Sequence, residues 1–186
     1  MLGTSVVPDV TSTLTAPLRS RTSSPALDFE ALYRAARDDV YAYVATLLRD
    51  RAAAEDVTAA AFERAYRKQR SYKAARGSGR AWLFGIARNA ALDELRRRKR
   101  AAALTAEPAE LDPVAPEDAA ETAVRRAVVR AALVALDPRE RELVALKFHA
   151  GLDNAEIAAV LGVSVSNAGT QLHRAMTKLR EAVEHA

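Results

Sequence analysis

The chain has 186 residues, of which 49% are hydrophobic and 5% aromatic, and it contains no cysteine. This length suits one large domain or two small ones, and the lack of cysteine excludes disulfide bonds and thiolate metal sites. No apolar run approaches the roughly 18 residues of a membrane-spanning helix, and the first residues lack the pattern of a secretory signal. We therefore expect a cytoplasmic protein with no membrane contact of its own.

The net charge of +4 is unevenly distributed along the chain. Residues 67–100 include twelve basic and two acidic residues, whereas residues 104–121 include six acidic residues and no basic one. A concentrated basic segment is typical of proteins that bind nucleic acid.

The first half of the chain predicts three helices after an unstructured start. Residues 1–26 are rich in Ser, Thr and Pro without sustained periodicity, which is typical of a disordered leader. Apolar residues then recur every three or four positions over 27–48, and Asp28 can cap the helix that this spacing predicts. A second helix is predicted at 51–70 and a third at 80–100, with a glycine-containing loop between them.

The second and third helices have predicted inward faces. On the second helix these residues are Val57, Ala61, Phe62, Ala65 and Tyr66. On the third helix they are Trp82, Leu83, Ile86 and Ala90, followed by Leu92 and Leu95.

An acidic segment with three prolines divides the chain at 101–119. Proline breaks helices, so this segment predicts an extended linker. The fold class that we predict is all-α, with two small helical domains at 27–100 and 120–186. The second domain begins with a predicted helix at 122–136.

Two capping signals follow in the second domain. Asp137 and Glu140 have the spacing of a capping box, with proline at the first helical position, and they predict a helix that ends near His149. Asp153 and Glu156 repeat this spacing and predict a short helix.

The end of the chain predicts a helix-turn-helix at 153–176. Gly162 can take the positive φ of a tight turn, and Ser164 can cap a last helix that ends near Glu184. The predicted buried face of that helix consists of Val165, Ala168, Leu172, Met176, Leu179 and Val183. Its exposed face near the start consists of Ser166, Asn167, Gly169, Thr170, Gln171, His173 and Arg174.

Side chains at the start of such a helix can reach base edges in the major groove. Asn and Gln can bind adenine in a bidentate manner, while Arg174 is better placed for phosphate. A helical hairpin in an unrelated all-α domain would show the same periodicity, and this alternative stays open.

The basic third helix and the loop at 71–79 form a second candidate site. Arg88 and residues 96–100 can neutralise phosphates, and Tyr72 and Trp82 can stack on an unpaired base. Core packing explains Trp82 equally well. The five consecutive cations at 96–100 would also suit the negative end of a helix dipole.

No pattern in the chain predicts an enzyme, so we expect no catalytic residue, no metal and no cofactor. The three histidines lack the spacing of metal ligands. A phosphate-binding glycine loop and a nucleophile elbow are both absent from the sequence.

Three motifs in this order resemble the extracytoplasmic-function class of bacterial sigma factors, which belongs to the sigma-70 type. The first motif is AEDV at 54–57 with FERAY at 62–66, and the second is WLFGIARN at 82–89 with LRRR at 95–98. The third covers 136–175 and includes LGVS at 161–164 and LHRA at 172–175. The resemblance implies a sigma factor that binds core RNA polymerase, recognises promoter DNA and promotes open-complex formation.

The resemblance assigns partners to each part of the chain. The second helix would bind the clamp of the largest polymerase subunit, and the last domain would rest on the flap of the second-largest subunit. An anti-sigma protein is a further expected partner. The implied core-polymerase contacts are Asp56, Val57, Phe62, Glu63, Arg64, Tyr66 and Arg67.

The resemblance also implies two sets of promoter contacts. The minus-ten set is Tyr72, Lys73, Arg76, Ser78, Arg80, Trp82, Arg88, Asn89, Asp93, Arg96 and Arg97. The minus-thirty-five set is Ser164, Ser166, Asn167, Gly169, Thr170, Gln171, His173 and Arg174.

The chain departs from the family at two places. Ala59 and Ala60 replace a Gln and an acidic residue in the core-binding helix, and Gly169 and Gln171 replace cations in the last helix. The second change removes phosphate attraction, so we expect binding to the upstream promoter element to be weaker or to have a different sequence specificity. The main rival reading is a helix-turn-helix regulator that binds duplex DNA without polymerase; a pure interaction module and an enzyme explain less of the sequence.

Overall fold

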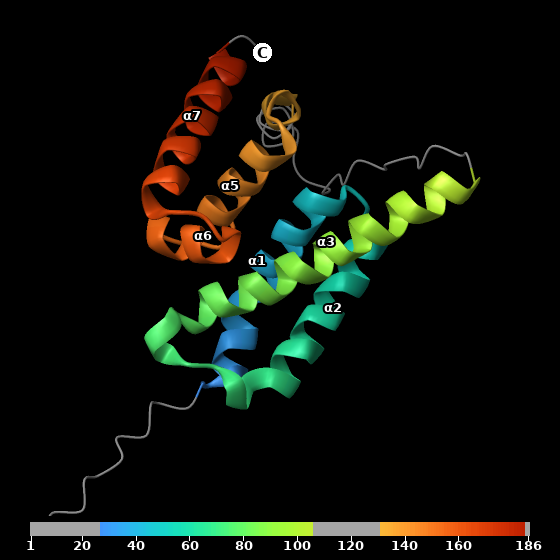
Figure 1. Ribbon diagram of the computed structural model, residues 1–186, viewed down its shortest axis with the longest axis vertical. Helices are drawn as coiled ribbons and strands as arrows, with labels where there is room; N and C mark the ends of the chain where they lie inside the picture. The colour runs from blue at the N-terminus through green and yellow to red at the C-terminus, as the bar shows by residue number, and fades with distance from the viewer. Residues whose placement is uncertain (1–26, 106–130, 185–186) are drawn as a thin grey trace, which may run out of the picture.

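The computed structural model describes residues 27–105 and 131–184, and within these ranges the chain forms helices and no strand (Figure 1). The predicted all-α fold is confirmed. The predicted leader at 1–26 and residues 106–130, which hold most of the predicted linker, lie outside the described residues.

Three helices form the first unit: α1 (Phe29–Leu48), α2 (Arg51–Lys68) and α3 (Gly79–Thr105). Each packs against the other two, and two short 3-10 turns, Gln69–Ser71 and Ala74–Arg76, lie between α2 and α3. α3 continues through Thr105, so the predicted helix end at residue 100 comes five residues too early.

Short-range signals start α1 and α2. The Asp28 carboxylate accepts a hydrogen bond from Ala31 N at 3.0 Å, as predicted, and the Asp50 carboxylate accepts one from Ala53 N at 3.0 Å. These N-caps satisfy amides that have no partner in the first turn of a helix. Between the two helices, Arg49 adopts the left-handed φ of 52° that allows the sharp reversal.

The second unit contains helical residues 131–135, α5 (Pro138–Phe148), α6 (Asn154–Leu161) and α7 (Val165–Glu184). Both predicted capping boxes, at the starts of α5 and α6, are confirmed. In this unit α5 and α6 each pack against α7.

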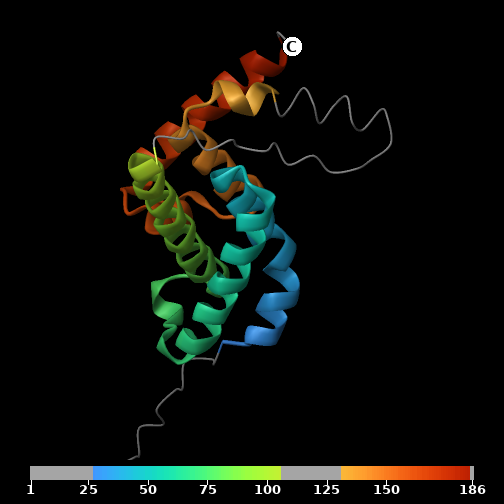
Figure 2. The same cartoon turned by 90° about the vertical axis from the view of Figure 1, so that its right-hand side faces the viewer.

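The two units pack against each other. α5 lies against α1 and α6 lies against α3, which places the second unit along one side of the α1–α3 bundle (Figures 1 and 2). One apolar cluster runs through both units, and its members include Tyr43 and Phe84 from the first unit and Leu143, Leu146 and Ile157 from the second. The helices that we predict to read DNA therefore belong to one packed body.

Three residues that were predicted to face inward lie at the surface. Tyr66 is 60% exposed, Val165 52% and Val183 40%. Tyr66 stands near the end of α2 and makes only an edge contact with the Phe29 ring, at 5.3 Å between centroids. Val165 and Val183 stand at the two ends of α7, beyond the middle part of the helix that is buried. Across the described ranges, no helix has both the length and the hydropathy of a membrane span.

Candidate nucleic-acid interface

The helix-turn-helix has the geometry that its sequence predicts. Gly162 ends α6 with a φ of 68°, a value that glycine adopts without steric cost. Val163 N then donates to Ala158 O at 3.0 Å, and Ser164 Oγ accepts from Asn167 N at 3.2 Å. Ala158 is buried at the point where the two helices meet. The turn therefore fixes the angle at which α7 leaves α6.

The start of α7 presents a polar surface. Ser166, Asn167 and Thr170 are exposed in its first turns, and His173 and Arg174 continue this face. The side chains of Asn167 and Gln171 also bond to each other, with Gln171 Nε2 donating to Asn167 Oδ1 at 2.8 Å. Gln171 would have to rearrange to bind a base edge with two hydrogen bonds, because its Oε1 atom is buried.

Gly169 leaves room that a neighbouring side chain fills. A Cβ atom added to Gly169 would lie 3.4 Å from the Asn154 side-chain nitrogen, at the start of α6. The two positions where the family carries cations are thus occupied by a glycine beside an asparagine amide and by Gln171, whose Oε1 atom is buried without a hydrogen-bond partner among the described residues.

The aromatic ring of Tyr72 in the loop contacts the ring of Trp82 at the start of α3. The rings of Tyr72 and Trp82 lie 5.6 Å apart between centroids at an angle of 57°. Tyr72 also donates its hydroxyl to Gly77 O at 3.0 Å, which closes the loop around the second 3-10 turn. A base that stacks here must use the outer side of this pair or separate the rings.

The cations of α3 and of the loop before it differ in how freely they can contact a phosphate. Arg80 and Arg88 are partly buried, and both contact the second unit of the chain. By contrast, Lys73, Arg76, Lys99 and Arg100 are exposed and have no ion pair within residues 27–105 and 131–184. A count of basic residues therefore overstates the charge that is free to meet phosphate.

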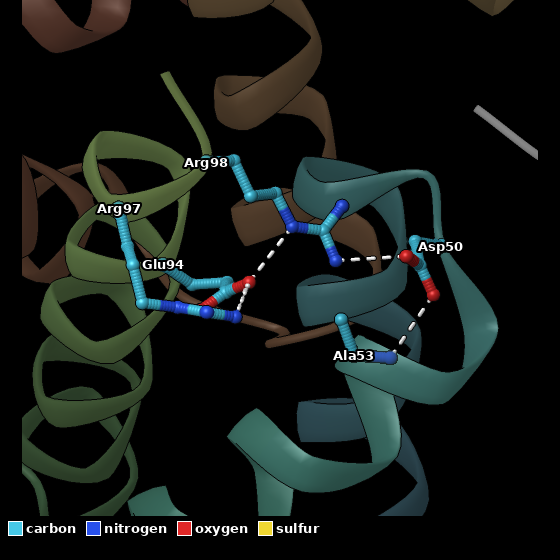
Figure 3. Close-up of polar contacts among 5 residues, drawn as sticks. All are labelled: Asp50, Ala53, Glu94, Arg97 and Arg98. Carbon is cyan, nitrogen blue, oxygen red and sulfur yellow. Dashed lines mark hydrogen bonds and ion pairs between the residues drawn. The ribbon is translucent and has the colours of Figure 1, made fainter. Parts of the chain in front are cut away.

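Near the end of α3, arginines and acids form an ordered cluster (Figure 3). Arg97 binds Glu94 through two hydrogen bonds of 2.7 Å, and Arg98 bridges Glu94 and Asp50, the N-cap of α2, at 2.8 Å each. The hydrogen bonds from Arg97 and Arg98 lower the pKa of Glu94 to about 2. Arg98 thus ties α3 to the start of α2.

The remaining predicted contacts of this helix lie on its outer side. Asn89, Asp93 and Arg96 are exposed, and Arg96 pairs with Asp93 at 3.1 Å. Such exposed pairs are weak and can exchange for a phosphate.

The predicted core-polymerase set divides into two kinds of residue. Asp56, Glu63, Arg64, Tyr66 and Arg67 lie on the exposed face of α2. The other two members of the set, Val57 and Phe62, are buried. Val57 therefore supports the position of the helix, whereas Phe62 also lines a groove between α1 and α2.

A groove of about 580 Å³ runs between α1 and α2 beside the exposed face of α2. Its walls include Tyr33, Tyr41 and Ala59. Ala59 is one of the two alanines that depart from the family pattern, so the departure lies on an open surface and not in the core.

Known proteins match both units of the chain. The family described as Sigma-70 region 2 matches residues 32–101, and the family described as Sigma-70, region 4 matches residues 126–179. The chain belongs to the sigma-70 family, in its extracytoplasmic-function class. The first match covers the three-helix unit and the second covers the helix-turn-helix, in the predicted order.

Relatives of this sigma factor include other sigma factors of the same class. It is 33% identical over 154 residues to the ECF RNA polymerase sigma factor BldN of Streptomyces coelicolor, with 81% of this chain and 58% of BldN covered. It is 28% identical to the ECF RNA polymerase sigma factor SigK of Mycobacterium bovis, with 95% of this chain and 97% of SigK covered. The chain thus spans less than two thirds of BldN and nearly all of SigK.

A solved structure shares the fold of this sigma factor. The sigma factor RpoE, in its co-crystal with the anti-sigma factor NepR from Bartonella quintana, aligns with a TM-score of 0.73 at 24% identity. The alignment covers 84% of this chain and 97% of that chain.

The residues that join the two units of the sigma factor include some that no sequence pattern had predicted as functional. Glu142 of α5 accepts hydrogen bonds from Arg88 of α3 and from Tyr43 of α1, although neither Glu142 nor Tyr43 was selected from the sequence. Asp39, which was not selected either, pairs with Arg80 within the first unit. One signal was available for Glu142, since it lies four residues before Leu146 on the apolar face of α5. In the described part of the chain, no group of three or more acidic or histidine side chains can hold a metal ion.

Proposed function

We propose that this sigma factor divides promoter recognition between its two helical units while α2 binds core RNA polymerase. The observation that carries this proposal is the order of parts on one chain, in which a region 2 unit with a basic third helix precedes a region 4 unit with a polar, exposed recognition helix. Sigma factors of this kind select the promoter and promote open-complex formation, and we assign no covalent chemistry to the chain.

The exposed face of α2 is the proposed contact with the clamp of the largest polymerase subunit. Tyr66 supports this assignment because it is a large aromatic residue that is 60% exposed, and exposed aromatic residues are enriched at protein interfaces. The groove beside Ala59 offers a further surface for the clamp where the family's glutamine is missing. The second unit is proposed to rest on the flap of the second-largest subunit.

The loop before α3 and the outer side of α3 are the proposed minus-ten site. The exposed cations Lys73 and Arg76 lie in the loop between Tyr72 and Trp82, so the same loop offers phosphate attraction and base stacking. Arg96 and Arg97 would add phosphate contacts after exchange of their local ion pairs.

The start of α7 is the proposed minus-thirty-five site. Its exposed face carries polar side chains and a single permanent cation, Arg174, in its first three turns. Binding at this element should therefore depend less on salt than binding by a lysine- or arginine-rich recognition helix.

An anti-sigma protein is a proposed partner, in the cytoplasm, and two features support it. The RpoE structure that shares this fold is a complex with an anti-sigma factor. The present chain also offers an exposed groove on the first unit at which such a protein can compete with polymerase.

Run-off transcription tests the proposed function. Purified core polymerase with genomic DNA should give discrete transcript starts when the full chain is added, and none of these starts with core alone. The absence of new starts would contradict the proposal. The rival reading, a regulator that works alone, predicts specific footprints on duplex DNA without polymerase, whereas a sigma factor requires the core enzyme.

A further inference from the structure

The second unit holds two arginines of the predicted minus-ten set. Arg88 Nε donates to Glu142 Oε1 at 2.6 Å, and the Arg88 side chain is only 17% exposed. Arg80 donates to the carbonyl oxygens of His149 and Ala150 at the C-terminal end of α5, in addition to its ion pair with Asp39 of its own unit. A carboxylate and the negative end of a helix dipole thus occupy the positions that phosphate oxygens would take on these guanidinium groups.

Glu142 is the centre of the contact. It is 5% exposed, and it accepts hydrogen bonds from Tyr43 of α1 at 3.2 Å and from Arg139 of its own helix at 3.2 Å, in addition to Arg88. Burial and the charge of Glu142 raise the pKa of Tyr43 well above its usual value, so that this hydroxyl keeps its proton and stays a donor. A buried carboxylate is tolerated only with such partners. The full set exists only while the units are packed together.

The contact extends to the loop before α3. The Ser78 hydroxyl donates to Glu156 of α6 while it also accepts from Ala81 N at 3.1 Å at the start of α3. Three members of the minus-ten set, Ser78, Arg80 and Arg88, are therefore engaged by the second unit.

The minus-thirty-five face is different, because packing leaves it open. Ser166, Asn167 and Thr170 remain exposed in the same arrangement. The packing of the units thus acts on one of the two promoter contacts and not on the other.

We propose that the packed arrangement is a self-inhibited form, in which Glu142 and the end of α5 compete with promoter phosphates for Arg88 and Arg80. This inference rests on the proposed function, because it concerns the regulation of the same minus-ten site. Polymerase and promoter then select the separated form, and their apparent affinities are reduced by the fraction of molecules that is separated.

The substitution Glu142→Gln tests the proposal directly. Arg88 would lose its charged partner in the packed form, and separation of the units would return the guanidinium to water. We expect the separated fraction to rise about tenfold or more, because breaking a buried ion pair costs more than the ~1.4 kcal/mol that a tenfold change represents. Glu140→Gln is the matched control, since it removes the same charge from the same helix but pairs with Lys178 of its own unit.

Two readouts follow the separated fraction in the full chain. The chain has no cysteine, so Arg34→Cys and Arg180→Cys provide one dye position in each unit. Energy transfer between the dyes should fall in Glu142→Gln and stay unchanged in Glu140→Gln. The rate of association with core polymerase should rise by the same factor, while the rate of initiation at saturating core stays unchanged.

A second variant covers the case in which Glu142→Gln does not fold. Tyr43→Phe removes one hydrogen-bond donor to Glu142 and keeps the ring against Phe84. It should move both readouts in the same direction by about threefold, the size of a single hydrogen bond.

The possible results separate the inference from the proposed function. A wild-type chain that directs transcription, together with folded Glu142→Gln and Tyr43→Phe variants that match wild type in energy transfer and association rate, would overturn the inference and leave the function intact. A wild-type chain that directs no transcription with core polymerase would overturn both.

Discussion

The two helices that we propose to face DNA, α3 and α7, differ in where their polar side chains are directed. α3 is rich in arginine, yet Arg80, Arg88, Arg97 and Arg98 are all engaged by carboxylates or carbonyls of the chain itself. The start of α7 carries few charges, and its polar residues face solvent. The number of charges in the sequence therefore overestimates how many side chains of the proposed minus-ten helix are free to contact DNA, and it underestimates this number for the proposed minus-thirty-five helix.

The largest expected difference in unfolding free energy is between a substitution on the buried side of α3 and one at the exposed start of α7. Phe84 is fully buried against Tyr43, with 5.4 Å between ring centroids, whereas Val165 is 52% exposed. Phe84→Ala should lower the free energy of unfolding by about 3–5 kcal/mol, and Val165→Ala should change it by less than about 0.5 kcal/mol. Urea denaturation of the full chain measures both values. A large loss with Val165→Ala would mean that the start of α7 is packed and not available to DNA.

The next prediction tests whether the arginines in the second half of α3 stabilise the fold or are available only for binding DNA. Arg98 bridges Glu94 and Asp50 (Figure 3) and has a side chain that is 22% exposed. Arg98→Ala should cost about 1–2 kcal/mol of unfolding free energy. Arg96→Ala, which removes an exposed pair with Asp93, should cost less than about 0.5 kcal/mol. Equal costs for the two variants would remove the distinction between the two arginines.

The parts of the fold that could be predicted are those that short-range signals determine. The capping boxes of α5 and α6, the cap by Ser164 and the turn at Gly162 depend on residues within a few positions of each other, and all are confirmed. The contact between Arg88 and Glu142 joins residues 54 positions apart. Helical periodicity places Glu142 on the apolar face of α5 but does not identify its partner, and only the packing of the two units shows that Glu142 pairs with Arg88.

The dependence on distant packing partners also explains why the burial of some apolar residues was predicted wrongly. Periodicity places Val165 and Val183 on the buried face of α7, but it does not indicate how far along the helix a partner extends. Phe84 shows the converse case. It was not assigned to the inward face of α3, although α1 covers it completely through Tyr43.

A pH titration measures how much the ion pairs of Glu94 contribute to the stability of the fold. The arginines hold its folded-state pKa at about 2, below the ordinary value of 4.5. Because the folded-state pKa is the lower one, Glu94 stabilises the fold above pH 4.5, and this stabilisation is lost as the pH falls from about 4.5 to about 2. Between these limits, wild type should lose on the order of 1 kcal/mol more unfolding free energy than Glu94→Gln. Parallel pH profiles for the two proteins would show that the cluster contributes nothing to stability.

The smallest expected effect tests whether missing charge or low helix stability limits the binding of α7 to the upstream promoter element. Gly169→Ala adds a Cβ that lies 3.4 Å from the flexible Asn154 side chain, and it should raise the unfolding free energy by about 0.5–1 kcal/mol through helix propensity. Gly169→Arg gains most of this propensity and adds a cation on the exposed face. For the holoenzyme on a promoter that it transcribes, only Gly169→Arg should strengthen protection of the upstream element, with a salt dependence that is steeper by about one counterion. Equal protection by both variants would mean that the glycine weakens this contact by loosening the helix, whereas a gain confined to arginine would locate the weakness in the missing charge.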